Sequence, residues 1–165
     1  MSEFSDLYSA QGEVVRRHVP REEAEALRHI GPYMGIVIVV IVNDKGDILY
    51  HRRHPEKRFE PDMYDHVCGG IHSHQSPEEA AMNEAQQEVG VTPIGLSLIS
   101  EGVNPYGFYR FLFRGTSNDE PSFDPEEKEV IFADYASLTI LRQMKADGEV
   151  FVDDFFSDIQ LAGLV

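Results

Sequence analysis

An uncharged apolar run, GIVIVVIV, extends from Gly35 to Val42 and is the strongest single indication of the fold. The run is rich in β-branched residues, which favour strands, and it is far too short to span a bilayer. We therefore expect a buried central strand. The Asn43 to Gly46 segment has turn chemistry, and residues 47–53 predict a second strand that forms a hairpin with the first.

The rest of the chain alternates between strand and helix patterns. Strands are expected over 63–68, 92–100, 108–113 and 129–135, a hairpin over 7–15, and helices over 20–28, 76–89, 136–146 and 150–161. No internal repeat or interdomain linker interrupts this pattern. We predict one mixed α/β domain over 1–165, with an N-terminal hairpin and arm at 1–30, a loop and helix at 69–91, and C-terminal helices at 136–165.

The charge balance excludes several classes of partner. Fourteen Lys and Arg against 29 Asp and Glu give a net charge of −15. Because Lys and Arg bind phosphate backbones by releasing counterions, we expect no nucleic-acid polymer as a partner, and an anionic membrane surface is disfavoured for the same reason. The single cysteine cannot form an intrachain disulfide, and the first ten residues lack a secretory pattern, so we expect a cytoplasmic protein.

A helix is predicted in the acidic stretch that follows a pair of glycines. Ser76 can cap this helix, Pro77 suits its first position, and Glu79 completes a capping box. Gly90 follows the last helical residue and stops the helix. The start and the end of this element are therefore both marked by local signals.

Glu84 and Glu88 lie on one face of the predicted helix, because residues four apart are neighbours. On a solvated face, two carboxylates at this spacing need no function. They could instead converge on a divalent cation, since Mg²⁺ takes oxygen ligands and bridges them to substrate phosphates. The Gly69-Gly70 loop directly ahead of the helix favours the cation, because it allows close backbone approach and places bare carbonyls beside the carboxylates.

This segment resembles the Nudix box, G-x5-E-x7-R-E-U-x-E-E-x-G-U, in which U is a bulky apolar residue. Its positions fall on Gly69, Gln75, Asn83, Glu84, Ala85, Gln87, Glu88, Gly90 and Val91. The spacing is intact, although Gln75, Asn83, Ala85 and Gln87 depart from the family's residue types. The resemblance runs from about residue 7 to residue 140 and implies an α/β/α sandwich with a mixed central sheet. The layout is similar to the branch related to isopentenyl-diphosphate isomerase.

The resemblance also implies a metal site and a reaction. Glu84 and Glu88 would be the catalytic residues and would bind Mg²⁺ or Mn²⁺, with the carbonyl of Gly69 as a backbone ligand. Further ligands could come from Gln87, Glu126, Glu127 and Glu129. The implied activity is hydrolysis of the diphosphate bond of a nucleoside diphosphate derivative, in which Glu84 or a later Glu deprotonates the attacking water.

The segment HRRHPEKR, residues 51–58, gathers basic side chains close to the predicted metal loop. It could be a strand end with solvated charges. In a chain at −15, however, a local basic cluster suits a small-molecule diphosphate that acidic surroundings would repel. Arg52, Arg53 and Arg58 are thus candidate substrate-binding residues. Because side chains alternate along a strand, only one of Arg52 and Arg53 should point into the site, and we favour Arg53.

Other interpretations stay open. The departures from the box would also suit a catalytically weak or silent module that binds a nucleotide or a protein partner. Cys68 aligns with the catalytic cysteine of isopentenyl-diphosphate isomerase, which suits an isomerase-like enzyme, but a buried and chemically idle cysteine is favoured. His66, His72 and His74 could suggest zinc, yet we prefer surface histidines. The N-terminal arm and strand pairs are compatible with a homodimer.

Overall fold

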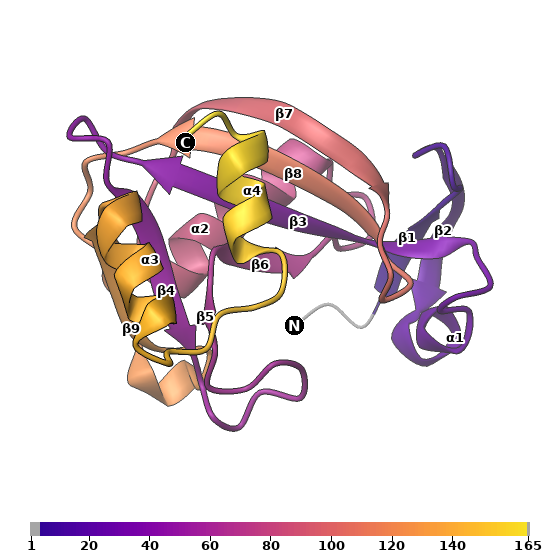
Figure 1. The fold of residues 1–165 in the computed structure, drawn as a ribbon. Helices are drawn as coiled ribbons and strands as arrows, with labels where there is room; N and C mark the ends of the chain where they lie inside the picture. The colour runs from indigo at the N-terminus through magenta and orange to yellow at the C-terminus, as the bar shows by residue number, and fades with distance from the viewer. Residues whose placement is uncertain (1–3, 165) are drawn as a thin grey trace.

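The computed structural model describes residues 4–164, which form a mixed sheet between layers of helices (Figure 1). The strands are β1 (Phe4–Tyr8), β2 (Val14–Pro20), β3 (Tyr33–Val42), β4 (Ile48–Arg53), β5 (Tyr64–Asp65), β6 (Val67–Gly70), β7 (Ile94–Val103), β8 (Tyr109–Thr116) and β9 (Val130–Ala136). The helices are α1 (Arg21–Ala26), α2 (Pro77–Val89), the 3-10 turn η1 (Pro125–Glu127), α3 (Leu138–Ala146) and α4 (Phe155–Leu161). Among these residues, no helix is long and apolar enough to cross a membrane.

The predicted central strand is β3, which pairs with β8 in parallel and with β1, β4 and β6 in antiparallel orientation. Its alternate residues enter two separate cores. Val37, Val39 and Ile41 pack with the alanines of α2, whereas Ile38 and Val40 pack with α3 and α4. Because both faces of the strand are covered, every position of the run can be apolar.

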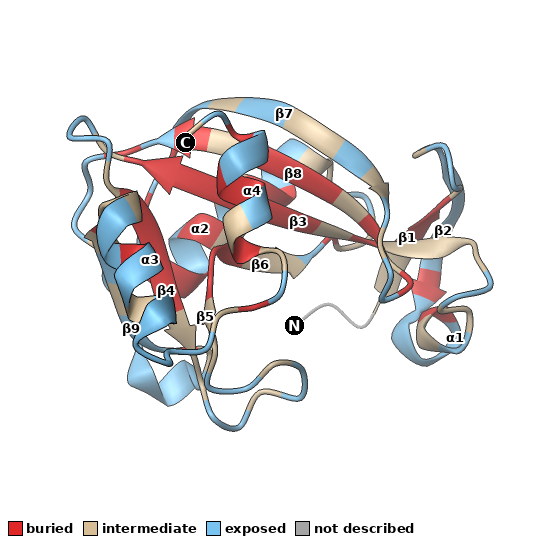
Figure 2. Ribbon diagram, in the orientation of Figure 1, coloured by how far each residue is buried: buried red, intermediate tan, exposed pale blue. Residues whose placement is uncertain are grey.

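The two cores make the predicted α/β/α sandwich. Figure 2 shows the buried residues concentrated along β3 and β8, with α2 behind the sheet and α3 and α4 in front of it. The mixed central sheet predicted from the sequence is therefore confirmed.

Both ends of α2 follow the predicted signals. Ser76 Oγ accepts a hydrogen bond from the Glu79 N–H at 3.1 Å, and Glu79 Oε2 accepts one from the Ser76 N–H at 3.0 Å. Gly90 ends the helix in the left-handed region, at φ 64°. Small, fully buried residues such as Ala81 and Ala85 let α2 approach the sheet closely, and this fixes the position of its acidic face.

Two predicted elements differ from the structure. Residues 63–68 were expected to be one strand, but the chain changes partner within them: β5 pairs with β4, and β6 pairs with β3. The expected helix over 150–161 forms only from Phe155. Residues 150–152 are extended instead, because the Tyr64 N–H donates to the Val150 carbonyl at 2.9 Å and the Val152 N–H donates to the Tyr64 carbonyl at 3.0 Å.

The N-terminal hairpin is tied to the loop ahead of α2 through Asp6, which is buried. Its carboxylate accepts hydrogen bonds from the His18 N–H, the Ser73 hydroxyl and the His74 N–H, each at 3.0 Å, and from Arg17 at 2.8 Å. Burial acts to raise the pKa of Asp6, but these donors together hold it below the ordinary value. The arm at the start of the chain thus supports the loop that begins the box.

Candidate functional site

The α2 helix places Glu84 and Glu88 beside β6. Glu84 lies directly against Gly69: a Cβ at position 69 would collide with the Glu84 carboxyl group and lie 2.6 Å from its Cγ. Glu88 is one turn further along and is only 8% exposed. Its Oε2 atom has no hydrogen-bond partner in the part of the chain that the structure describes.

The electrostatics of the pair are unfavourable without a cation. Burial, followed by the charge of Glu129, raises the pKa of Glu84 to about 7. Burial, followed by the charge of Glu84, raises the pKa of Glu88 well above its ordinary value. His51 Nε2 lies 3.5 Å from Glu88 Oε2, but burial lowers the pKa of His51 to about 3, so the ring is neutral at pH 7 and does not compensate the charge.

These donors fit a hard divalent cation. They are carboxylate oxygens, one of them is buried and unpartnered, and Gly69 allows close backbone approach. Glu129 is within electrostatic reach of Glu84, although it forms an ion pair with Lys57. Within residues 4–164, no group of three or more His, Cys, Asp and Glu side chains is arranged to hold a metal ion. The candidate site therefore centres on the two α2 carboxylates.

The other proposed ligands lie elsewhere. Glu126 and Glu127 are exposed in η1, and Gln87 is exposed on α2. Of the four additional candidates, the structure brings Glu129 toward the carboxylate pair. Glu129 immediately precedes β9, and the pairing of β9 with β4 brings it to the end of the sheet where the carboxylate pair lies.

The raised pKa values predict that the cation-free protein loses stability as the pH rises. In the unfolded chain the Glu84 carboxyl releases its proton near pH 4.5. In the folded state its pKa is about 7, so it keeps the proton to a higher pH. The free energy of unfolding should therefore fall between about pH 4.5 and pH 7. Thermal unfolding in chelator should give a lower Tm at pH 8 than at pH 5.

Two variants isolate this effect. Glu84→Gln should shrink the difference in Tm between pH 5 and pH 8, because the amide does not ionise. Glu78→Gln, an exposed glutamate of the same helix, should leave the difference close to that of the wild type. An unchanged difference in Glu84→Gln would show that the carboxylate pair is not its source.

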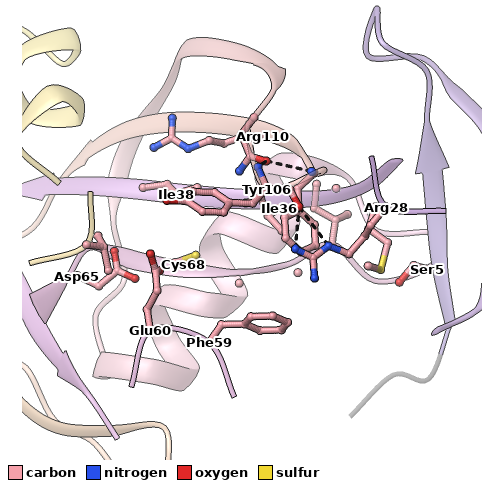
Figure 3. A pocket seen from close by; sticks show the side chains of 18 of the residues that line it. Ser5, Arg28, Ile36, Ile38, Phe59, Glu60, Asp65, Cys68, Tyr106 and Arg110 are labelled. Atoms are coloured by element: carbon pink, nitrogen blue, oxygen red, sulfur yellow. Dashed lines mark hydrogen bonds between the residues drawn. The ribbon is translucent and has the colours of Figure 1, made fainter. Parts of the chain in front are cut away.

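A cavity of about 380 Å³ opens beside Gly69 (Figure 3). Arg53 and Lys57 reach its wall, as do Asp65 and Cys68. Arg53 is held firmly: its Nη1 donates to Asp65 Oδ2 at 3.1 Å, and its other nitrogens donate to backbone carbonyls of residues 59 and 60. The cavity thus places the fixed positive charge of Arg53 next to the candidate metal site.

The three predicted arginines separate in the structure. Arg53 lines the cavity, whereas Arg52 turns away and binds Asp62, with a nitrogen–oxygen distance of 3.0 Å. This is the alternation expected of a strand. Arg58 is exposed and does not line the cavity, although Glu25, with which it pairs at 3.3 Å, does. Of the three candidates, Arg53, which the sequence favoured over Arg52, thus lines the cavity, and Arg52 and Arg58 do not.

Sequence reasoning missed three residues at the cavity. Lys57 belongs to the basic segment already singled out, so its spacing from Arg53 could have identified it. Asp65 has no such signal, because it meets Arg53 only when β5 pairs with β4. Arg28, from the N-terminal arm, reaches the cavity through tertiary packing alone.

Cys68 and the three histidines lie in different environments: Cys68, which was expected to be buried, is only partly buried and lines the cavity together with His72. Burial raises the pKa of the Cys68 thiol well above its ordinary value, so the thiol is neutral at pH 7. The expectation of a surface histidine is wrong for His66, which is buried under α4 with its ring stacked on Phe155 at a centroid distance of 4.0 Å. Its Nε2 lies 2.9 Å from the Phe155 carbonyl oxygen. His72 is half-buried and His74 is exposed.

Comparisons with known proteins identify relatives of this chain. A family model described as the NUDIX domain matches residues 32–155. Two proteins named "Uncharacterized Nudix hydrolase YfcD", from Escherichia coli (strain K12) and Salmonella typhi, are each 31% identical over 96 residues, which is 56% of this chain and 50% and 49% of those proteins. The chain therefore spans about half the length of the curated relatives it matches.

Solved structures show the same fold. The DR0079 protein from Deinococcus radiodurans has a TM-score of 0.74 and 22% identity, over 98% of this chain and 99% of that one. The MutT protein from Methanosarcina mazei Go1 has a TM-score of 0.64 and 21% identity, over 82% of this chain and 94% of that one. At these identities, the likeness concerns the fold.

Proposed function

Because the chain belongs to the Nudix family, we propose that it is a metal-dependent hydrolase that cleaves the diphosphate bond of a nucleoside diphosphate derivative. The observation that carries the proposal is the pair of Glu84, which is partly buried, and Glu88, whose buried Oε2 has no hydrogen-bond partner among the described residues, next to Gly69 and a cavity that Arg53 and Lys57 line. The relatives named as Nudix hydrolases support the reaction class.

Glu84 and Glu88 would hold Mg²⁺ or Mn²⁺ beside Gly69, with Glu129 as a further carboxylate. When bound, such a cation supplies Lewis-acid chemistry that polarises a phosphoryl oxygen. The two carboxylates would then gain the positive charge that they lack in the cation-free protein. The same cation would lower their pKa values, because an opposite charge favours the ionised form.

The basic residues of the cavity would bind the diphosphate. Arg53 presents a positive charge that Asp65 and two carbonyls keep in one place, and Lys57, which pairs with Glu129, adds a second charge. Together they offset the repulsion that a chain of net charge −15 exerts on a phosphate ligand. Glu84 or Glu129 would accept the proton of the water that attacks phosphorus.

A second candidate is a Nudix-fold module that binds a nucleotide without hydrolysing it. Gln87, in the position of a box glutamate, is exposed and neutral. In the described range, moreover, no third acidic side chain joins Glu84 and Glu88 in a metal-binding group. Cys68 gives no comparable support to an isomerase, because its thiol is neutral at pH 7.

Hydrolysis of a panel of nucleoside diphosphate derivatives with Mg²⁺ or Mn²⁺ tests the proposal. The wild-type protein should release nucleoside monophosphate, and the double variant Glu84→Gln, Glu88→Gln should not. Exposed Glu78→Gln is the matched control, which should hydrolyse at the wild-type rate. Equal release by the double variant would overturn the proposal. Nucleotide binding without any release by the wild type would favour the binding module.

A further inference from the structure

Three further arginines line the cavity and have no part in the proposed reaction: Arg21, which pairs with Glu25, Arg110, which pairs with Asp154 and Asp158, and Arg28. Arg28 follows α1, in the arm that precedes the residues matched by the family model, and it lines the cavity. Figure 3 shows Arg28 on the opposite side of the cavity from Asp65 and Cys68, which lie near the candidate metal site. Any group that Arg28 contacts would therefore be a distant part of the ligand.

The guanidinium group of Arg28 is held in one orientation. Its Nε and Nη2 atoms donate to the Tyr106 carbonyl at 3.1 and 2.7 Å. Its Cζ atom lies 4.7 Å from the centroid of the Phe108 ring and 5.3 Å from that of Phe59. These contacts use one edge of the guanidinium fork, and they keep its plane fixed.

The other edge of the fork remains available. It consists of Nη1 and the second proton of Nη2, and Nη1 has no hydrogen-bond partner among the residues that the structure describes. Two parallel N–H donors at this edge match a ligand that presents two adjacent acceptor atoms in one plane.

The walls around Arg28 favour a flat ring over a second anion. Phe59 and Phe108 flank the guanidinium group, and Met34 and Ile36 line the same cavity, whereas the charged lining residues Arg21 and Glu25 pair with each other. An anion would lose its hydration there, whereas a heteroaromatic ring can pack against Phe59 and Phe108. The cavity volume, about 380 Å³, is in the range of small-molecule sites.

We propose that Arg28, supported by Phe59 and Phe108, determines specificity by binding the base of the nucleotide through two adjacent acceptors. Guanine presents such an edge at N7 and O6, and cytosine presents one at N3 and O2. Adenine and uracil place a donor beside each acceptor on the corresponding edges. The inference rests on the proposed function, because the diphosphate must lie near Arg53 and Lys57 for the base to reach Arg28.

Binding of non-hydrolysable α,β-methylene nucleoside diphosphates tests the inference independently of catalysis. Titration calorimetry would compare the wild type with Arg28→Met, which removes the fork, and with Arg28→Lys, which retains the charge. Both variants should raise the Kd for the guanosine and cytidine compounds roughly 5–100-fold, the range for a lost bidentate pair. They should also lose the preference over the adenosine and uridine compounds.

Two controls separate the base from the rest of the molecule. Methylenediphosphonate, which has no base, should bind the wild type and both variants equally. Arg16→Met changes an exposed arginine of the same arm that pairs with Glu23 outside the cavity, so it should bind all compounds as the wild type does. Thermal unfolding of each variant confirms that the arm remains folded.

The outcomes for the inference and for the proposed function are distinct. Equal weakening of base-bearing and base-free compounds by Arg28→Met, or no weakening at all, would overturn the role of Arg28 even if hydrolysis is observed. Base-dependent binding that is lost in both Arg28 variants, together with an absence of hydrolysis, would overturn the proposed reaction and support the base subsite.

Discussion

Glu88→Gln is expected to slow diphosphate hydrolysis by roughly 10²–10⁴-fold and at the same time to stabilise the cation-free protein. The side chain is buried beside Glu84, and its Oε2 atom has no hydrogen-bond partner among the described residues. Glutamine has nearly the same shape but removes the charge that would bind a cation. It also removes the repulsion from Glu84, which should increase the free energy of unfolding at pH 8 by roughly 1–3 kcal/mol.

Steady-state kinetics with Mg²⁺ and thermal unfolding in chelator at pH 8 measure the two effects. A simple loss of packing would lower activity and stability together, whereas the loss of a cation ligand lowers activity and raises stability. Glu78→Gln removes one charge from an exposed position on the same helix, and it should change both quantities only slightly. Full activity of Glu88→Gln, or a lower Tm than the wild type at pH 8, would contradict the assignment of Glu88.

Gly69→Ala is expected to abolish detectable Mg²⁺ binding and to reduce activity by roughly 10²-fold or more, although it adds a single methyl group. The new Cβ would lie 2.6 Å from Glu84 Cγ and would collide with the carboxyl group, so Glu84 must leave its place against β6. The φ angle of Gly69 is not positive, and the strand backbone can therefore accommodate alanine. The fold should survive the substitution.

Gly70→Ala is the matched control for this prediction. Apart from Gly70 itself and its two chain neighbours, none of the described residues has an atom within 4 Å of the position that a Cβ at Gly70 would take, so Glu84 should keep its position in this variant. Calorimetric titration with Mg²⁺ should show binding to Gly70→Ala and none to Gly69→Ala, at similar Tm values. Equal Mg²⁺ binding by both variants would mean that the site does not depend on Glu84 lying against Gly69.

The elements that the sequence predicted well have signals within a few residues. A run of eight apolar residues can be accommodated only as a strand covered on both faces, and the structure has β3 there. The capping box at Ser76 and Glu79 and the stop at Gly90 mark α2 from both ends. The shared face of Glu84 and Glu88 follows from helical periodicity alone.

The elements that were predicted wrongly depend on distant partners. Residues 150–152 have apolar spacing suited to a helix, yet backbone hydrogen bonds to Tyr64 keep them extended. His66 belongs to a short, polar-looking segment, but the change of strand partner between β5 and β6 turns its ring under α4. Neither the hydrogen bonds to Tyr64 nor the packing of His66 under α4 is indicated by the residues nearby in the sequence.

The candidate site divides in the same way. Sequence alone was enough for the central strand, the capped helix and its pair of carboxylates, because strand and helix periodicity and capping are local interactions. The folded arrangement was needed to bury Glu88, to pair Arg53 with Asp65, and to bring Arg28 from the N-terminal arm to the cavity. These contacts join residues far apart in the chain, and their geometry results from packing the sheet between its two helical layers.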